Sequence, residues 1–519
     1  MEGAAAKARL SRSGRIGLHP LGDEAFLLEE QDDFRFLHSG VCTQLLREMK
    51  KGILARAFLL SVVLALLVAL VREDVESSLL IRQADRYRAL KEYGRAITIY
   101  QQLSVLRSQW GLPHLRLGEV YSLQGRWDEA EAEFSRAREL DKREDEALLG
   151  LGLVAYHEGD IEDAIDHWRQ AAGLNPRNVE AHHRLGQTYL QRSQFEQARR
   201  ELEWAVLHDG GHRQAHYYLG LLLAAEDATL ASEHLSLVAG GEDAQLSERA
   251  QEMVLLLEEI ATSEDEAYVA ARLGHAYVKY EVPSLALVQL ERVVALQPDN
   301  DAARAYLGYT LFALGEYDRA REVLREVTRL APKSPLGYYF LAVVHRSEGY
   351  LPTALWEFRR SLRLDPSNAA VYADIGDTYG RMRQYLAAGE WYQTAVEVAP
   401  GEADFRLLLA QFYVDVLPRA EEGLAAARGA VGLAPDDALA QDLLGWAHYL
   451  AGNSVEARVA LERALRLDPD FARGYYHLGV VCAQLGDEDK AQWAYERAID
   501  LDSHGLYRDR AMAELGMKE

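Results

Sequence analysis

The dominant feature of the chain is a pattern of apolar and polar positions that repeats about every 34 residues between residues 77 and 505. In each copy, apolar residues recur at three- and four-residue steps over two segments that are separated by a short polar turn. This spacing predicts two amphipathic helices per copy. The stretch 307–332, "LGYTLFALGEYDRAREVLREVTRLAP", shows both segments, with Gly315 in the turn and Pro332 after the second segment. The pattern therefore predicts an all-α chain of stacked helical hairpins.

Small residues hold fixed places in this pattern. In the first segment of successive copies a Gly recurs at intervals of 34 residues, as at Gly118 and Gly152. In the second segment an Ala precedes a large apolar residue by four places, as in the pair Ala164 and Trp168. A glycine inside a helix costs about 1 kcal/mol relative to alanine. That cost is acceptable where a neighbouring helix must approach closely, so we expect the two helices of each hairpin to meet at these glycines.

Proline marks the end of seven of the twelve copies. Seven of the 13 prolines occupy one place of the repeat, namely Pro176, Pro298, Pro332, Pro366, Pro400, Pro435 and Pro469. Because proline cannot continue a helix, each of these residues is expected to end the second helix of its copy.

These features resemble the tetratricopeptide repeat, in which Leu-Gly-x-x-Tyr lies in the first helix and Ala-x-x-x-Phe with a final Pro in the second. The segments "LGEVYSLQGRWDEAEAEF" (117–134) and "IGDTYGRMRQYLAAGEWY" (375–392) carry the resemblance most clearly. It implies an α-solenoid, a right-handed superhelix of helical hairpins. Twelve copies are expected, starting near residues 77, 111, 145, 179, 213, 267, 301, 335, 369, 403, 438 and 472.

The copies depart from the pattern in four places. The first copy lacks the Leu-Gly pair and the Pro, although Ala84, Tyr87, Ala96 and Tyr100 fit. An extra amphipathic segment between the fifth and sixth copies predicts an inserted helix within 242–266, which divides the array into a five-copy lobe (72–241) and a seven-copy lobe (267–505). The tenth copy has Gly423 in place of Ala and one additional residue. Residues 506–519 are expected to form a capping helix.

One segment before the repeats predicts a membrane anchor. Residues 52–71, "GILARAFLLSVVLALLVALV", would form a helix of roughly 30 Å, which is the thickness of the hydrocarbon core of a bilayer. A buried core helix is the alternative, and the absence of any polar face over 57–71 favours the membrane. Since about fifty residues precede the segment and no small-x-small site follows it, a signal anchor fits better than a cleaved signal peptide.

The flanking charges favour an N-terminus in the cytoplasm and an extracytoplasmic repeat region. Arg47, Lys50, Lys51 and Arg56 precede the apolar core of this segment, whereas Arg72, Arg82 and Arg86 follow it. Residues 1–51 are expected to be a flexible tail.

Composition and motifs point away from catalysis. The net charge of −24 disfavours general binding of nucleic acid. Cys42 and Cys482 are far apart and form no metal-type pair. The dinucleotide-like "GLGLVA" at 150–155 is expected to lie inside a helix, without the strand that such a motif requires. His208, His212 and His216 are spaced four apart, but Gly210 and Gly211 interrupt the helix between the first two, so no metal site and no cofactor are predicted.

The resemblance places partner binding on the first helix of each hairpin, which lines the concave groove in tetratricopeptide proteins. The second, fifth, ninth and twelfth places of the copies give the candidate residues, which are aromatic in the middle of the array. They are Tyr217, Leu221, Tyr268, His275, Tyr309, Phe312, Tyr339, Val343, Arg346, Trp446, Tyr449 and Tyr476. Aromatic groups with polar tips are good anchors for a peptide. The alternative is that several of them pack against the adjacent first helix.

Together these features favour a membrane-anchored scaffold that binds protein or peptide partners in its groove, with no chemistry of its own. Assembly of a membrane or envelope complex is the expected role. A regulatory subunit that presents substrates to a separate membrane enzyme is the alternative.

Overall fold

The computed structural model describes residues 75–140, 144–241, 243–502 and 505–517, together with Leu60 and Val63. The tail and nearly all of the segment 52–71 lie outside these residues, so the predicted anchor is not tested. No helix among the described residues is both long and apolar enough to span a bilayer. Residues Ser77–Glu519 form one compact unit, which contains α2 to α26.

Every regular element in the described part of the chain is helical, as the hydrophobic pattern predicts. A first helix covers residues 75–89. It is followed by α2 (Tyr93–Leu106), α3 (Gly111–Leu123), α4 (Trp127–Leu140), α5 (Glu144–Glu158), α6 (Ile161–Leu174), α7 (Val179–Gln191), α8 (Phe195–His208), α9 (Arg213–Leu223), α10 (Ala228–Val238), α11 (Ala244–Ile260), α12 (Glu266–Lys279), α13 (Pro283–Leu296), α14 (Asp301–Ala313), α15 (Tyr317–Leu330), α16 (Pro335–Ser347), α17 (Leu351–Leu364), α18 (Ala369–Arg381), α19 (Tyr385–Val398), α20 (Ala403–Gln411), the π-helix η1 (Phe412–Val416), α21 (Ala420–Leu433), α22 (Ala438–Leu450), α23 (Ser454–Leu467), α24 (Ala472–Gln484), α25 (Glu488–Leu501) and α26 (Leu506–Glu514).

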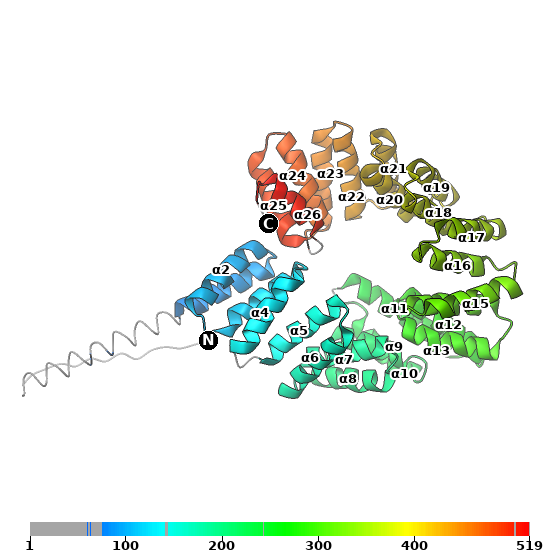
Figure 1. Ribbon diagram of the computed structural model, residues 1–519, viewed down its shortest axis with the longest axis horizontal. Coiled ribbons are helices and arrows are strands. Elements are labelled where there is room, and N and C mark those ends of the chain that lie inside the picture. Colours follow the sequence, from blue (N-terminus) through cyan, green and yellow to red (C-terminus); the bar gives the residue numbers. More distant parts are fainter. Residues whose placement is uncertain are drawn as a thin grey trace, which may run out of the picture. The chain divides into compact units, whose positions relative to one another are not determined.

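The helices pack as successive hairpins (Figure 1). The two helices of a hairpin, such as α5 and α6, make the most extensive contacts, and the second helix then packs against the first helix of the next hairpin. This arrangement confirms the predicted array of helical hairpins.

The repeat glycines allow the close approach within each hairpin. Gly152 of α5 faces Trp168 of α6, and a Cβ atom on Gly152 would overlap the indole ring. Trp168 is only 1% exposed, and its Nε1–H donates to the carbonyl of Leu149 on α5 at 3.2 Å. The mid-helix glycine therefore makes the space that the large side chain of the second helix fills.

The turn within most hairpins contains one residue in the left-handed region. It is Gly in six copies, including Gly315 at φ +79°, and Lys91, Ser193, Glu281 or Arg383 in others. A side chain is disfavoured in this conformation by about 1–2 kcal/mol because Cβ crowds the backbone. The short turn thus holds these four residues in a conformation that they would not choose by themselves.

The inserted helix α11 lies within the predicted segment 242–266 and joins the core. One cluster of buried apolar residues runs from Ala155 to Val344 and includes Met253 and Leu257 of α11. Beyond this insertion α13 contacts α7, which belongs to a hairpin two copies earlier. The copies on both sides of α11 therefore share one continuous core.

The additional residue of the tenth copy appears as a change of helix type. The first helix of that copy starts as α20 and ends in η1, a π-helix over Phe412–Val416. A π-turn holds one more residue than an α-turn, so it absorbs an insertion without a break in the helix. Phe412 and Val414 remain buried as a result.

The two ends of the array contact each other, which the repeat pattern does not predict. Helix α2 of the first hairpin packs against α25 of the last hairpin (Figure 1). The backbone N–H of Gly94 donates to Oδ1 of Asp500 at 2.7 Å.

We predict that substitutions at two helical glycines have opposite effects. Gly152→Ala should lower the free energy of unfolding by roughly 1–3 kcal/mol, because its methyl group must displace Trp168. Gly173→Ala, also inside a helix but with open space around its Cβ position, should raise it by up to about 1 kcal/mol. Urea titration followed by circular dichroism measures both changes. Equal effects would show that close approach is not the reason for the glycine.

We also predict that the turn residues can be exchanged in both directions. Ser193→Gly should stabilise the chain by about 1 kcal/mol, since glycine adopts the left-handed conformation without strain. Gly315→Ser should destabilise it by a similar amount. Thermal midpoints of the two variants test this, and a stabilising Gly315→Ser substitution would contradict it.

Candidate functional site: the face formed by the first helices

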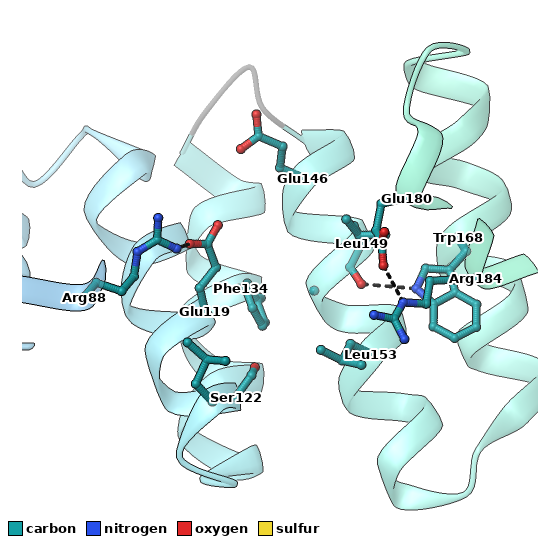
Figure 2. A pocket seen from close by; sticks show the side chains of 12 residues that line it. Arg88, Glu119, Ser122, Phe134, Glu146, Leu149, Leu153, Trp168, Glu180 and Arg184 are labelled. Carbon is teal, nitrogen blue, oxygen red and sulfur yellow. Dashed lines mark hydrogen bonds and ion pairs between the residues drawn. The ribbon is translucent and has the colours of Figure 1, made fainter. Parts of the chain in front are cut away.

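A well-formed pocket of the described chain lies on the first helices of the second to fourth copies. It has a volume of about 460 Å³, within the range of ligand-binding pockets. Side chains of α3, α5 and α7 line it, with Phe134 of α4 and Trp168 of α6 below them (Figure 2). We call it the α3–α5–α7 pocket. Its lining is Arg88, Glu119, Ser122, Leu123, Phe134, Glu146, Leu149, Gly150, Leu153, Trp168, Glu180 and Arg184.

The floor of this pocket exists because one side chain is missing. Gly150 holds the sixth place of its copy, where each of the other copies carries a side chain, such as Arg116 or Arg184. A Cβ atom on Gly150 would lie 2.5 Å from the ring of Phe134. The aromatic ring therefore reaches the α5 backbone, and Leu149 and Leu153 on either side of the glycine remain only partly buried. Both glycines of the "GLGLVA" segment lie inside α5, which confirms the helical interpretation of that motif.

Ion pairs border the apolar floor on two sides. Arg88 bonds to Glu119 on one side, and on the other Nε of Arg184 donates to Oε1 of Glu180 at 2.6 Å (Figure 2). The charged groups are thus held in place before any partner arrives, which reduces the entropy that binding would cost. Such a pocket suits a bulky apolar side chain whose polar neighbours contact the border.

The sequence prediction did not include this pocket, although several of its lining residues hold the repeat places that predict groove residues. Glu119, Glu146, Leu149 and Leu153 occupy the second, fifth and ninth places, as the predicted aromatic residues do in later copies. The prediction favoured aromatic side chains and so passed over aliphatic and charged ones. The signal that was available is Gly150, the missing side chain at the sixth place.

Two of the predicted groove residues are buried, which corrects the prediction for them. Tyr217 is 3% and Leu221 0% exposed. The hydroxyl of Tyr277 donates to the carbonyl of Leu221 at 2.9 Å, and Arg249 of the inserted helix lies near Tyr217. Helix α11 and the sixth copy therefore cover these side chains, and a partner cannot reach them.

Tyr268 and His275 are exposed, but each already has a neighbour. The hydroxyl of Tyr268 donates to Glu259 of α11 at 2.5 Å. His275 packs edge-on against Tyr306 of the next copy, with 5.2 Å between ring centroids.

The aromatic residues of the seventh and eighth copies form one half-buried group. Tyr309 stacks on Phe340 at 4.8 Å between centroids and also contacts Phe312, while Tyr339 lies beside Phe340. Another pocket, of about 280 Å³, borders Tyr309. These residues thus pack on the adjacent first helix, as the alternative interpretation expects, and still leave part of their rings accessible. Val343 is likewise half-buried.

Charged and aromatic groups tie the later copies together on the same face. Arg346 bonds to Asp374 of the next copy at 2.6 Å. Trp446 stacks on His477 at 4.1 Å and on Tyr449 at 4.5 Å between centroids, and Tyr476 adjoins His477. These predicted residues are half-buried.

A buried charge network supports the Trp446 stack. Asp442 is fully buried and accepts from Arg473 at 2.7 Å and is bonded to Nδ1 of His477 at 2.8 Å. Burial alone would raise the pKa of Asp442, but His477 and Arg473 hold it below the ordinary value. The guanidinium of Arg473 also reaches Asp415 of the tenth copy at 3.0 Å. The network thus links three copies.

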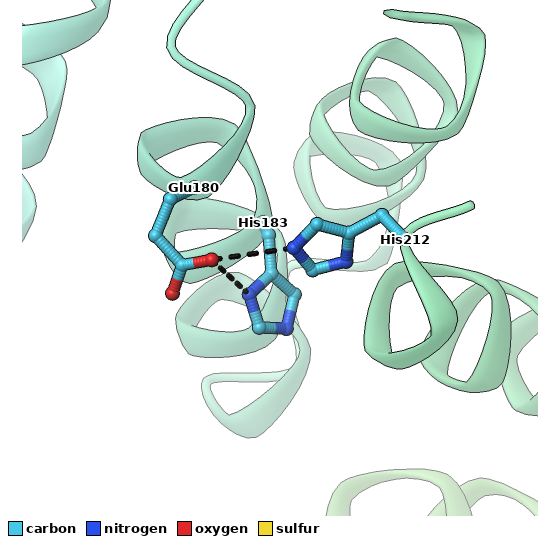
Figure 3. A group of neighbouring side chains, drawn as sticks. All are labelled: Glu180, His183 and His212. Atoms are coloured by element: carbon cyan, nitrogen blue, oxygen red, sulfur yellow. Dashed lines mark hydrogen bonds and ion pairs between the residues drawn. The ribbon is translucent and has the colours of Figure 1, made fainter. Parts of the chain in front are cut away.

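The three histidines considered as metal ligands do not converge. His208 stacks on Trp204, and Nδ1 of His216 faces Nδ1 of His234 at 2.8 Å. A different trio lies close together: Oε2 of Glu180 is 3.2 Å from Nε2 of His212 and 3.6 Å from Nδ1 of His183 (Figure 3). These residue types and spacings could border a divalent cation.

The hydrogen bonds around this trio do not fit a metal. A ligating imidazole donates its second N–H to an acceptor. Nδ1 of His212 instead accepts the backbone N–H of Ala215 at 3.2 Å, and so caps α9. In the neutral ring the proton is then on Nε2, which donates to Glu180 and has no lone pair for a cation. Arg184 already neutralises the other oxygen of that carboxylate.

The trio therefore joins the fourth and fifth copies. Burial alone would raise the pKa of Glu180, but His183, His212 and Arg184 hold it well below its ordinary range. Burial lowers the pKa of His183, which keeps that imidazole neutral near pH 7. Glu180 is thus an ionised acceptor shared by both copies and by the border of the α3–α5–α7 pocket.

Comparison with known families agrees with the hairpin geometry. Sequence profiles described as tetratricopeptide repeat match residues 155–232 and 283–343, 115–182, and 369–402 and 472–504, and one described as TPR repeat matches 445–486. Together these matches cover more than half of the chain.

Among curated proteins, the chain is similar to the BBSome complex member BBS4 homolog of Drosophila melanogaster, with 27% identity over 64% of this chain and 68% of that protein. It is also similar to anaphase-promoting complex subunit 3 of Schizosaccharomyces pombe, with 25% identity over 31% of this chain. It spans only 24% of the latter protein.

Among solved structures, yeast Tom70 aligns over 85% of this chain and 95% of its own, at 16% identity and a TM-score of 0.39. The protein YrrB, described as having an unusual peptide-binding site, aligns over 37% of this chain and 99% of its own, at 23% identity and a TM-score of 0.32. The repeat profiles and the helical hairpins show that this chain belongs to the tetratricopeptide repeat proteins.

Proposed function

We propose that this protein is a membrane-anchored scaffold that binds protein partners on the face of its first helices, with the α3–α5–α7 pocket as the principal anchor point. The observation that carries the proposal is the combination of an apolar floor with ion pairs fixed on two sides. Interfaces obtain most of their affinity from a few large side chains that enter such pockets. The half-buried group around Tyr309 and Tyr339 would extend the contact along the same face.

The relatives support a role within a larger assembly. Two of them are named as a complex member and a complex subunit, and we propose the same kind of role for this chain. Residues 52–71 would hold it at a membrane, with the repeats on the extracytoplasmic side. The role is one of surface recognition, for which no reactive group is needed.

We predict that a charge inside the pocket weakens partner binding. Leu153→Glu places a carboxylate on the apolar floor, where it would be desolvated by a bound side chain and would therefore weaken binding at least tenfold. A photo-crosslinking amino acid at Ser122, in the full-length protein in its own membrane, measures capture. The matched control is Leu207→Glu, at a position 78% exposed on α8.

The thermal midpoints of the two Glu variants should agree, which separates binding from stability. Joint replacement of Tyr309, Phe312 and Tyr339 by Ala tests the second group in the same assay. Undiminished capture by Leu153→Glu would contradict the pocket as the anchor. Loss of capture only in the triple variant would place the anchor on the aromatic group.

We predict that the protein stays in the membrane fraction after alkaline carbonate washing and is released when residues 52–71 are deleted. Protease added to intact cells or spheroplasts should degrade the repeat region. Complete protection of the repeats would reverse the orientation, and extraction of the full-length protein by carbonate would contradict the anchor.

A further inference from the structure

The last hairpin supplies a helix cap to the first hairpin. Helix α2 begins at Tyr93, and its own N-cap residue, Glu92, makes no capping hydrogen bond through its side chain. Asp500 of α25 takes that role, since its Oδ1 accepts the Gly94 N–H at 2.7 Å. A carboxylate at this end of a helix also interacts favourably with the helix dipole. A cap provided from 406 residues away is a long-range contact of specific geometry.

Further polar contacts join the same two regions. Nη1 of Arg497 donates to the carbonyl of Lys91 at 2.8 Å, and Lys91 pairs with Asp470. Beside them, Nη2 of Arg508 donates to the carbonyl of Gln124 at 2.5 Å. We call this set of contacts, together with Gly94 and Asp500, the end seam.

The end seam differs from the contacts between neighbouring hairpins. Neighbouring hairpins share apolar clusters, but within the described residues the cluster of the first copies ends at Val154 and that of the last copies begins at Ala457. The seam is held by hydrogen bonds and ion pairs, and no apolar cluster spans it within the described residues. Separation of the ends therefore exposes little apolar surface, whereas separation of any two neighbouring hairpins exposes a core.

We infer that the end seam is a clasp, the contact at which the array opens while its hairpins stay folded, and that this opening admits partners to the face of the first helices. The admission of partners by this opening rests on the proposed function. Asp500 is the central residue of the clasp, because it bonds to α2 directly and lies next to Arg497, the second residue of α25 that reaches the first copy.

The surroundings of Asp500 couple the clasp to pH. Burial raises the pKa of its carboxyl to about 6, against the Gly94 N–H and Arg497, which lower it. The other charged or titratable groups on the Asp500 side of the seam are Lys91, Glu92, Tyr93, Asp470 and Glu496, and around Arg508 they are Arg126, Glu129, Asp502 and Asp509. In an open array Asp500 returns to an ordinary pKa of about 4. The closed form thus holds more protons between pH 4 and 6, so closure is favoured as the pH falls through 6 and weakened as it rises.

The clasp is tested by the distance between its two sides. Nitroxide labels at Gln102 of α2 and Glu488 of α25, both exposed, report this distance in the full-length protein with Cys42→Ser in detergent micelles. We predict that a narrow distance dominates the distribution of the parent protein at pH 7, with a minor longer component. Asp500→Ala should replace it with a broad, longer distribution, and Asp500→Asn should keep it, because the amide oxygen can still accept the Gly94 N–H.

A matched control separates opening from general destabilisation. Asp437 caps α22 within its own copy by accepting the Ala440 N–H at 2.7 Å. Asp437→Ala should lower the thermal midpoint as the loss of a cap does, yet leave the label distance unchanged. In the parent protein the narrow component should grow from pH 7.5 to pH 5, and in Asp500→Asn it should not change. An unaltered narrow distance in Asp500→Ala would overturn the clasp.

A disulfide across the seam tests its use. The Cβ position of residue 94 lies 3.2 Å from Oδ1 of Asp500, so Gly94→Cys and Asp500→Cys together are placed to form a disulfide. Oxidation should reduce partner capture at Ser122 at least fivefold, and dithiothreitol should restore it. Equal capture in both states would overturn the gating role. Absence of capture in either state, with the label distances as predicted, would instead refute the proposed function.

Discussion

The structure depends on one constraint, the close approach of two helices within each hairpin at a glycine that has no side chain. At Gly152 the approach is so close that the indole of Trp168 occupies the place of a Cβ atom. The same relation recurs at Gly118 with Phe134 and at Gly445 with Leu461. A hairpin built in this way has apolar sides that it cannot bury alone, so it must stack on the next one. The first helices are thereby lined up on one face, and this regular scaffold positions every candidate binding residue.

Function in such a scaffold depends on where the repeat is broken. Gly150 breaks it by removing one side chain, and the α3–α5–α7 pocket forms there. The inserted helix α11 breaks it in the opposite sense, since α11 and the sixth copy together cover Tyr217 and Leu221 and remove them from the accessible face. His212 replaces the Asn or Asp that caps the first helix in other copies, such as Asn178 and Asn300, and thereby connects α9 to Glu180. Each departure changes the surface locally without changing the packing that the period maintains.

The sequence was sufficient for the features that recur with the period. Helical hairpins, the turn at Gly315 and the helical setting of Gly150 and Gly152 all follow from spacing alone, because each copy repeats the same local signal. Burial within the groove was not predictable in the same way. Tyr217 is at the fifth and Tyr309 at the ninth place of its copy, both of which predict groove residues. Tyr217 is buried because α11 and the sixth copy cover this region, whereas Tyr309 stays half-buried. The π-helix η1 was predictable in part. The sequence shows the additional residue of the tenth copy, but it does not show that this residue changes the helix type from α to π.

The contact between the ends shows why a repeat sequence underdetermines its tertiary structure. Each hairpin fixes a small rotation to the next one, and the distance between the first and last copies depends on the sum of all these rotations. A change of rotation at α11 or η1 would therefore shift Gly94 relative to Asp500. The two ends are complementary in detail. Asp500 accepts a hydrogen bond from the start of α2, which has no side-chain cap of its own, and Arg497 donates to the carbonyl of Lys91, a turn residue at φ +56°. This complementarity is independent evidence that the two ends interact. Because these groups lie in the first and the last copy, the stacking of neighbouring copies does not require their contacts. These groups therefore form an interaction between the two ends of the array. Because this interaction is polar, the end seam can open while the apolar cores between neighbouring hairpins stay closed.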